Sequence, residues 1–193
     1  WEYDASGNIT KYVDSEGHTT KYEYDLNGNN TKIVDAKGNY VSMEYNYLNL
    51  LSKKESNGKL LETYSYDNAG NLIKKIDSNG TVYTYEYSAT NQITKMVKTS
   101  KNGKAKYSEI YSYDKGDNLS KITYDDGTEE SFTYNGNGDV TSYKDKNGNK
   151  TLYSYSYNGN LVKVTKPDGN FNCYSYDENN NLTVKEECDA KTG

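Results

Sequence analysis

The residues that could carry acid–base or nucleophilic chemistry are few in this 193-residue chain. His18 is the only histidine and comes just after a turn glycine, which favours a solvated turn residue over a catalytic base. The paired carboxylates Asp125-Asp126 and Glu129-Glu130 stand at turns and strand ends, where solvation explains them better than an acid/base pair does. The sequence therefore predicts no catalytic residue, no cofactor and no enzyme.

The sequence also contains no clear motif for metal binding or for reactive cysteines. Repeated Asp-x-x-Gly turns resemble part of a calcium loop but lack the alternating oxygen ligands and the distal bidentate glutamate, so no metal site is predicted. Cys173 and Cys188 have neither a CxxC motif nor a histidine neighbour. Two readings stay open: a disulfide, if a hairpin brings the two together, or two free thiols. A thiol count under denaturing, non-reducing conditions separates them.

Tyrosine is the distinctive residue, with 23 copies against 2 Phe and 1 Trp. The pattern Φ-x-Tyr-Asp-x-x-Gly-Asn-Φ recurs along the chain, and each copy is numbered here from its second aromatic residue as offset zero. The nine zero positions are Tyr3, Tyr24, Tyr45, Tyr66, Tyr87, Tyr113, Tyr134, Tyr155 and Tyr176. Every step is 21 residues except the step from Tyr87 to Tyr113, which is 26. A strict period of this size indicates a repeat architecture, here a single array over residues 1–193.

Each zero position ends a strand with two unlike faces. Offset −2 is large and apolar or aromatic in all nine copies, and offset −1 between the two aromatics is always polar, mostly Glu or Ser. Alternation with period two and many aromatic residues predicts a β-strand.

A turn follows each of these strands. Offset +1 is Asp, Asn or Ser, whose side-chain oxygen can accept backbone N–H groups two residues on. Offset +4 is Gly, Asn or Asp in every copy, the residues that tolerate positive φ. A second turn is marked by Gly at offset +14 in six copies, and pairs such as Asn57-Gly58 and Asn79-Gly80 are strong hairpin signals.

The strand after the first turn carries an apolar residue at offset +6, with Asn30 as the exception, and Lys at offset +8 in seven copies. A five-residue turn would place +6 opposite the zero tyrosine and +8 opposite the −2 aromatic, so that the lysine stem lies along that ring. The five extra residues near Lys101-Asn102-Gly103-Lys104 are expected to lengthen one hairpin without breaking the array.

Each repeat thus resolves into two strands of about six residues and two tight turns. Nine copies predict an all-β fold of about 18 antiparallel strands, without helices, in one hairpin array that curls into a spiral or partial shell. With 33% hydrophobic residues and a mean hydropathy of −1.09, its core is expected to be thin and aromatic.

Charge and composition exclude several partners. The net charge is −5 and lysines alternate with acids, so no basic stripe for nucleic acid exists. No apolar run is long enough to span a bilayer. The chain begins inside a repeat, so we expect it to be a piece of a longer array. Unpaired terminal strands recruit partners, which predicts edge-to-edge self-association at high concentration.

The tyrosine ladder has two readings. In the first, the rings stack to hold the sheet together. In the second, some rings stay exposed and bind carbohydrate or a cell-surface protein, as amphipathic aromatic rings can. The candidate ligand-binding residues of the second reading are Tyr22, Tyr24, Tyr64, Tyr66, Tyr85, Tyr87, Tyr111, Tyr113, Tyr153, Tyr155, Tyr174 and Tyr176.

These motifs resemble the YD-repeat, or Rhs-repeat, family, whose pattern is close to Tyr-x-Tyr-Asp-x-x-Gly-Asn/Arg-Leu followed by an Asp-x-x-Gly turn. The resemblance covers essentially the whole chain and is carried by Tyr22 to Asn29, Tyr64 to Leu72, Tyr111 to Leu119 and Tyr174 to Leu182, while Asn46 to Leu51 resembles a common family variant. The family includes bacterial Rhs and wall-associated polymorphic toxins, shell components of insecticidal toxin complexes, and teneurins.

The resemblance implies a spiralling β-sheet that forms a hollow shell around a C-terminal toxin in bacteria, or supports cell-surface adhesion in teneurins. It implies a structural scaffold in a secreted or cell-surface parent protein, with a C-terminal cargo domain as partner. The bacterial shells typically close with an Asp-Pro-containing segment. This chain has one proline, Pro167, and no Asp-Pro, so neither that segment nor a toxin is present in it.

Overall fold

A computed structural model describes residues 1–188, with side chains up to residue 187, and assigns eighteen strands to one antiparallel sheet. No helix occurs in those residues, which confirms the predicted fold class and strand number. The strands are β1 (Glu2–Tyr3), β2 (Ile9–Val13), β3 (Thr19–Tyr24), β4 (Asn30–Val34), β5 (Tyr40–Tyr45), β6 (Leu51–Ser56), β7 (Lys59–Tyr66), β8 (Leu72–Asp77), β9 (Val82–Tyr87), β10 (Ile93–Thr99), β11 (Lys106–Tyr113), β12 (Leu119–Tyr124), β13 (Glu129–Tyr134), β14 (Val140–Lys144), β15 (Lys150–Tyr155), β16 (Leu161–Thr165), β17 (Phe171–Tyr176) and β18 (Leu182–Cys188).

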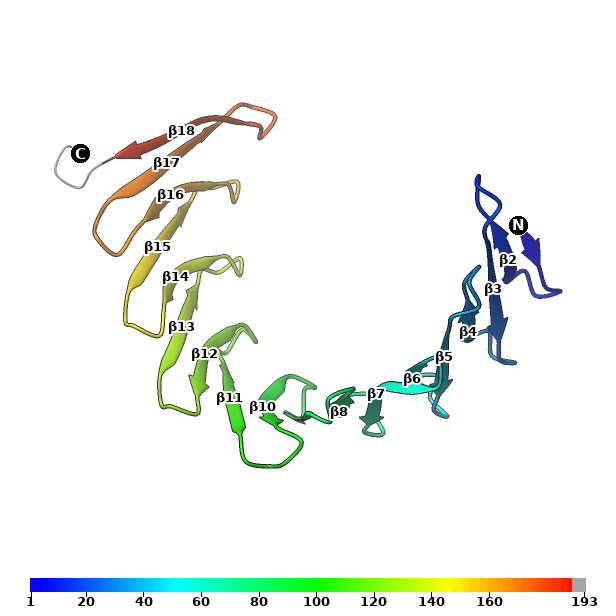
Figure 1. The fold of residues 1–193 in the computed structure, drawn as a ribbon. Helices are drawn as coiled ribbons and strands as arrows, with labels where there is room; N and C mark the ends of the chain where they lie inside the picture. The colour runs from blue at the N-terminus through cyan, green and yellow to red at the C-terminus, as the bar shows by residue number, and fades with distance from the viewer. Residues whose placement is uncertain (189–193) are drawn as a thin grey trace. The chain divides into compact units, whose positions relative to one another are not determined.

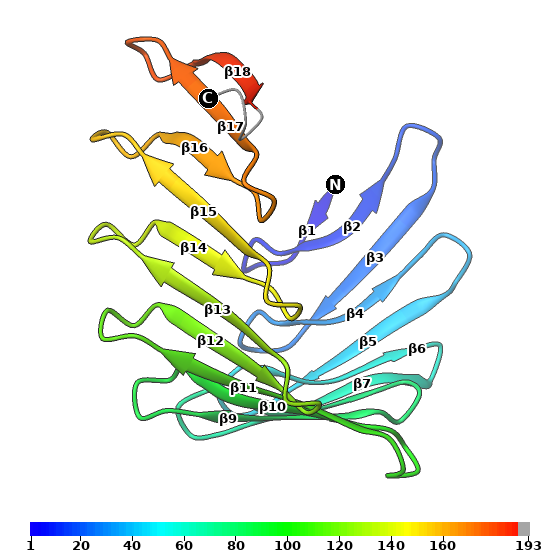
Figure 2. The same cartoon turned by 90° about the vertical axis from the view of Figure 1, so that its left-hand side faces the viewer.

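The chain divides into two compact units, Trp1–Tyr107 and Ser108–Gly193. Within each unit, hairpins follow one another in sequence order, so that a strand lies beside its predecessor and its successor (Figures 1 and 2). The boundary between the units lies in β11, directly after the turn that carries the extra residues of the 26-residue step.

Within a repeat, the strands that flank the first turn pair around a β-bulge. Tyr66 lies opposite Leu72, which confirms the expected pairing of offsets zero and +6. The expected place of offset +8 is wrong: Lys74 lies opposite Ser65, at offset −1, and it is offset +9 that faces the −2 aromatic. One extra residue at offset +7 causes this shift, because a bulge sets two residues of one strand against one of the other.

The bulge residue, at offset +7, is Ser or Thr in seven of the nine copies. In three repeats its hydroxyl donates to the backbone carbonyl at offset −1, eight residues earlier. These bonds are Ser52 to Glu44 at 3.0 Å, Ser120 to Ser112 at 3.1 Å and Thr183 to Ser175 at 3.1 Å. The hydroxyl thus gives a partner to a carbonyl at the disturbed step of the ladder.

Pairing between successive repeats is shorter than pairing within them. Strands β8 and β9 are aligned over three residue pairs, from Lys74 opposite Thr84 to Ile76 opposite Val82, whereas β7 and β8 are aligned over five. Offsets −2 to zero of one repeat therefore extend past the aligned part of the strand before them.

The sheet has no second layer to cover it. No hydrophobic residue in the described part of the chain is fully buried, and Ser142 is the single buried residue there. The register places offsets −2, 0, +6 and +9 on one surface, which we call the aromatic face, and offsets −1 and +8 on the opposite surface, which we call the polar face. In place of the expected thin aromatic core, the described residues have a half-buried aromatic face.

Left-handed residues close the turns as predicted. All nine offset +4 residues have positive φ, including the non-glycine residues Asn49 (58°), Asn91 (61°), Asp117 (63°) and Asn180 (62°). Of the Asn-Gly and Asp-Gly pairs, Asn57-Gly58 differs, because both residues have positive φ, at 48° and 75°. That combination is the two-residue type I′ hairpin turn, and it explains why this glycine comes one place early.

Asn30 breaks the apolar pattern at offset +6, and its side-chain oxygen Oδ1 is buried without a hydrogen-bond partner. We expect Asn30→Leu to stabilise the array by about 1–2 kcal/mol, because it removes an unsatisfied buried acceptor and adds apolar contact. Urea denaturation followed by circular dichroism measures this effect. The matched change Leu51→Asn in the next repeat should destabilise, and a lower midpoint for Asn30→Leu would contradict the assignment.

The cysteine prediction falls partly outside the described side chains. Cys173 lies opposite Glu186, and Cys188 lies opposite Phe171, so the two cysteines occupy diagonal positions of the β17–β18 ladder. The side chain of Cys188 is beyond the described residues. A disulfide between the two therefore stays a prediction, and the thiol count remains its test.

Candidate functional site

The aromatic face carries all twelve tyrosines predicted as candidate ligand contacts. Each is half-buried, neither enclosed nor freely exposed, because neighbouring hairpins cover its edges. Two tyrosines outside this predicted set are much more exposed. The side chains of Tyr47 and Tyr157, at the tips of first turns, are 81% and 102% exposed. Sequence reasoning missed these two, although their place at offset +2, inside the turn, is a signal that could have found them.

The zero-position tyrosines tie each repeat to the one before it. In seven repeats the phenol donates to the backbone carbonyl fifteen residues earlier, which is offset +6 of the preceding copy. These bonds, of 2.8 to 3.0 Å, run from Tyr24 to Ile9, Tyr45 to Asn30, Tyr66 to Leu51, Tyr87 to Leu72, Tyr134 to Leu119, Tyr155 to Val140 and Tyr176 to Leu161. The phenol bridges the place where the two strands are no longer aligned.

The polar face carries cross-strand ion pairs that follow from the bulged register. Where offset −1 is Glu, the lysine at +8 reaches it: Lys11 to Glu2 at 2.7 Å, Lys32 to Glu23 at 3.4 Å, Lys53 to Glu44 at 3.0 Å and Lys95 to Glu86 at 3.1 Å. These pairs are substantially exposed, so each contributes at most about 1 kcal/mol. Because the pairs recur once per repeat, a role in aligning the strands explains them better than a catalytic role does.

The first turns are held by a side-chain oxygen at offset +1, which belongs to a carboxylate in five of the nine copies. Asp67 Oδ1 accepts the backbone N–H of Ala69 and of Asn71, each at 2.9 Å, and its Oδ2 accepts the Asn71 side chain at 3.0 Å. The turn opening predicted for offset +1 is confirmed. Asn71 also donates to Asn91 Oδ1 of the next turn at 2.9 Å, and the same contact joins Asn160 to Asn180.

These contacts hold the pKa of the turn carboxyls below its usual value. For Asp67 the first cause is the hydrogen bond from the Asn71 side chain, followed by the backbone N–H of the same residue. The pKa is also lowered in Asp4, Asp14, Asp25, Asp35, Asp77, Asp114, Asp126, Asp145 and Asp177.

Acid should therefore destabilise the array. A carboxyl whose pKa is lower in the folded state contributes stability above its unfolded pKa of 3.8, and this contribution is lost as the pH falls through the folded value. We expect urea midpoints to fall between about pH 5 and about pH 3. Asp67→Asn, Asp25→Asn and Asp177→Asn combined should make this fall shallower, because Asn46 already accepts the same backbone N–H groups without titrating. If the urea midpoint fell equally steeply with pH in the parent and in the triple variant, the prediction would be contradicted.

The candidate catalytic residues are not brought together. His18 is exposed, with Nδ1 3.1 Å from Asp14 Oδ2 in its own turn. Glu129 pairs with Lys121 at 3.0 Å, while its neighbour Glu130 points to the opposite face of β13. Within the described residues no group of three His, Cys, Asp or Glu side chains is placed to hold a metal ion, and no helix is long and apolar enough to cross a membrane.

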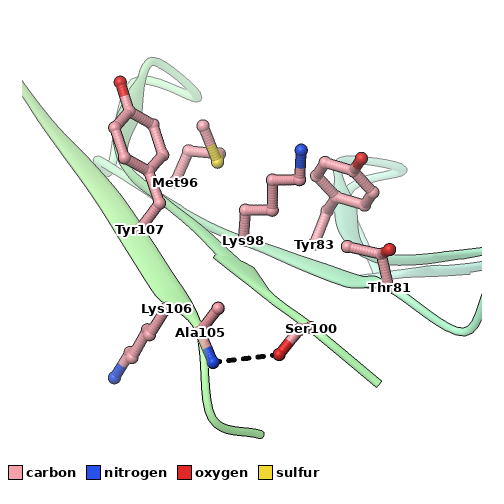
Figure 3. A pocket seen from close by; sticks show the side chains of 8 residues that line it. All are labelled: Thr81, Tyr83, Met96, Lys98, Ser100, Ala105, Lys106 and Tyr107. Carbon is pink, nitrogen blue, oxygen red and sulfur yellow. Dashed lines mark hydrogen bonds between the residues drawn. The ribbon is translucent and has the colours of Figure 1, made fainter. Parts of the chain in front are cut away.

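A pocket with a volume of about 630 Å³ lies beside the turn between β10 and β11, which carries the extra residues of the 26-residue step. Figure 3 shows Tyr83, Met96, Lys98 and Tyr107 on one side of the sheet and Lys106 directed away from them. Lys98 Nζ lies 5.7 Å from the centroid of the Tyr83 ring, and Ser100 Oγ accepts the Ala105 N–H at 3.0 Å. The ammonium group is therefore already placed on an aromatic ring.

A second depression, of about 480 Å³, lies on the aromatic face of the second unit. Its lining is Glu130, Phe132, Val140, Tyr143 and Tyr153. The rings of Phe132 and Tyr143 stack with centroids 5.1 Å apart and planes 27° apart. Burial first, and then the charge of Glu130 and a hydrogen bond to it, raise the pKa of Tyr143. One carboxylate thus lies among three aromatic rings.

Comparison with known proteins identifies the kind of array. The family model described as RHS Repeat matches residues 3–40, 66–102 and 134–170, more than half of the chain. The chain belongs to the Rhs-repeat family. No curated protein sequence matches it.

Solved structures share the fold at low sequence identity. The crystal structure of TcdB2-TccC3-TEV matches with a TM-score of 0.81 and 17% identity over 100% of this chain and 11% of that one. TcdB2-TccC3 without its hypervariable C-terminal region matches at 0.79 and 16% over 97% of this chain and 11% of that chain. The Photorhabdus luminescens Tc holotoxin pore with a TccC3 mutation matches at 0.56 and 18% over 88% and 9%. The chain spans about a tenth of the length of these proteins, and what it shares with them is the fold.

Proposed function

We propose that this array is a wall segment of a β-sheet shell, and that the parent protein uses the shell to enclose or present a C-terminal cargo domain. Membership in the Rhs-repeat family and the shared fold with TcdB2-TccC3 support the proposal. One of the matched structures is described as lacking a hypervariable C-terminal region, which makes a variable C-terminal partner a reasonable cargo. Likeness to a holotoxin pore component supports a secreted parent.

The observation that carries the proposal is a junction between repeats that recurs along the chain. A strand pairing of three residues recurs between repeats together with a tyrosine hydroxyl bond, and the β6–β7 junction has the same bond beside four pairs; the described residues form no second layer. A wall built this way grows by adding repeats, because each copy stabilises only its neighbours. An extended wall of this kind is better suited to enclosing a space than to forming one deep binding pocket.

The proposal includes no enzymatic activity for this segment. Its titratable groups are engaged in turn bonds and cross-strand ion pairs, such as Asp67 with Asn71 and Lys53 with Glu44. Catalysis in the parent would then reside in the cargo and not in the wall.

Limited proteolysis of the full parent protein tests the enclosure. The C-terminal domain should resist protease in the parent and be digested rapidly when expressed alone. Tyr45→Ala combined with Tyr66→Ala should expose it, because both repeat-to-repeat bonds are lost. Tyr47→Ala is the control, since that ring stands 81% exposed at a turn tip. Equal digestion of the domain inside and outside the parent would refute the proposal.

A second candidate function is adhesion to carbohydrate or to a cell-surface protein through the aromatic face. The half-exposed rings at offset −2, such as Tyr22 and Tyr64, favour it, because amphipathic rings suit sugar contacts. A glycan array with the 193-residue chain is the test. Reproducible binding that is lost in Tyr22→Ala with Tyr64→Ala, but kept in Tyr47→Ala, would favour adhesion over enclosure alone.

A further inference from the structure

The aromatic face carries a carboxylate at offset −4 in three repeats, namely Glu62, Glu109 and Glu130. In the Tyr66 repeat this carboxylate is paired with a cation from its own chain. Lys75 Nζ lies 2.5 Å from Glu62 Oε1, and Glu62 Oε2 accepts the hydroxyl of Tyr64. The same ammonium lies 5.8 Å from the centroid of the Tyr64 ring. An ammonium group is thus held between a carboxylate and an aromatic ring.

The Tyr134 repeat has the same arrangement without the cation. Glu130 corresponds to Glu62, and Phe132 corresponds to Tyr64, but offset +9 is Tyr143 where the other repeat has Lys75. The depression of about 480 Å³ described above lies at this place. Among the side chains of residues 1–187, no cation is within ion-pair distance of Glu130, whereas the adjacent Glu129 is paired with Lys121 on the polar face.

The surroundings of Glu130 define the class of ligand. Its negative charge and the rings of Phe132, Tyr143 and Tyr153 together attract a cation with an apolar surface. Lys146 Nζ, from the turn after β14, lies 3.2 Å from the centroid of the Tyr124 ring, which is not one of the rings that line the depression. Burial first, and then the negative charge of Glu130, raise the pKa of Tyr124 and of Tyr143, so the carboxylate acts on the rings around it.

We propose that the depression lined by Glu130, Phe132, Val140, Tyr143 and Tyr153 is a binding site for a quaternary ammonium group of the choline type. The ligand's methyl groups contact the three rings, and its charge faces the carboxylate. The site is independent of the proposed shell function, since it needs only the folded β12–β15 region.

Titration of the 193-residue chain with choline and with tetramethylammonium, followed by calorimetry and by aromatic NMR shifts, tests the site. One saturable site is expected for both ions. The uncharged isostere 3,3-dimethylbutan-1-ol and the primary amine methylammonium should each bind at least about tenfold more weakly. Glu130→Gln should weaken choline binding by a similar factor. Equal affinity for the uncharged isostere, or stronger binding of methylammonium, would overturn the choice of ligand.

The two repeats also serve as controls for each other. Tyr143→Lys restores the arrangement of the Tyr66 repeat, so it should abolish choline binding while the thermal melt remains cooperative. Conversely, Lys75→Tyr removes the internal ammonium beside Glu62 and should raise the stoichiometry from one site to two. Absence of saturable choline binding to the wild-type chain, or binding that Tyr143→Lys and Glu130→Gln leave unchanged, would overturn the proposal.

Discussion

Replacing Tyr66 with alanine is expected to lower the free energy of unfolding by about 2–4 kcal/mol, because a half-buried ring and its bond to the preceding repeat are both lost. The hydroxyl of Tyr66 donates to the Leu51 carbonyl at 2.8 Å, beyond the part of β7 that is aligned with β6. The ring itself covers the aromatic face at this junction. Urea denaturation monitored by circular dichroism measures the change.

Tyr66→Phe separates the two contributions. It keeps the ring but leaves the Leu51 carbonyl without its phenol, which should cost about 1–3 kcal/mol. Tyr3→Phe is the matched control, because Tyr3 occupies offset zero of the first repeat and is 60% exposed. If Tyr66→Phe and Tyr3→Phe had the same small effect, the tyrosine bonds would not be what joins the repeats.

Gly70→Val is expected to destabilise by about 1–2 kcal/mol or more, because Gly70 closes the first turn in the left-handed region and a β-branched residue is strained there. Its φ is 87°. Crowding adds little, since a Cβ at this position would meet only Leu50 Cδ1, at 3.5 Å. Equilibrium denaturation of variant and parent under the same conditions gives the difference.

Two controls isolate the effect of φ. Gly70→Asn should cost much less, because Asn49, Asn91 and Asn180 already occupy the same offset with φ near 60°. Gly136→Val should be nearly neutral, since Gly136 lies in another turn with no positive φ and with open space around it. A cost for Gly136→Val equal to that for Gly70→Val would show that valine in any turn is harmful and that φ is not the cause.

Part of the junction chemistry follows from the repeat pattern, although the sequence predictions do not include it. Ser or Thr stands at offset +7 in seven copies and marks the bulge, and in three of them, such as Ser52, the hydroxyl donates to the carbonyl at offset −1. Regular Asn at offset +5, such as Asn71, marks the bond between neighbouring turns. Both signals recur with the repeat, so position-by-position comparison of the copies could have found them.

The amino-acid pattern alone determined the repeat, the strand and turn positions, and the left-handed residue at offset +4. These features depend on local properties: alternation of polar and apolar side chains, side-chain bonds of Asp to nearby N–H groups, and tolerance of positive φ. They hold whatever surrounds the segment.

Tertiary structure alone decided the register, and with it the chemistry of both faces. The bulge after each first turn moves Lys74 from the −2 ring to offset −1, and it sets offset +9 beside the carboxylate at −4. A one-residue shift of this kind exchanges the faces on which side chains stand, and periodicity within a strand contains no information about it. For the same reason, the contrast between Lys75 and Tyr143 depends on the pairing of the strands and not on the sequence pattern within one strand.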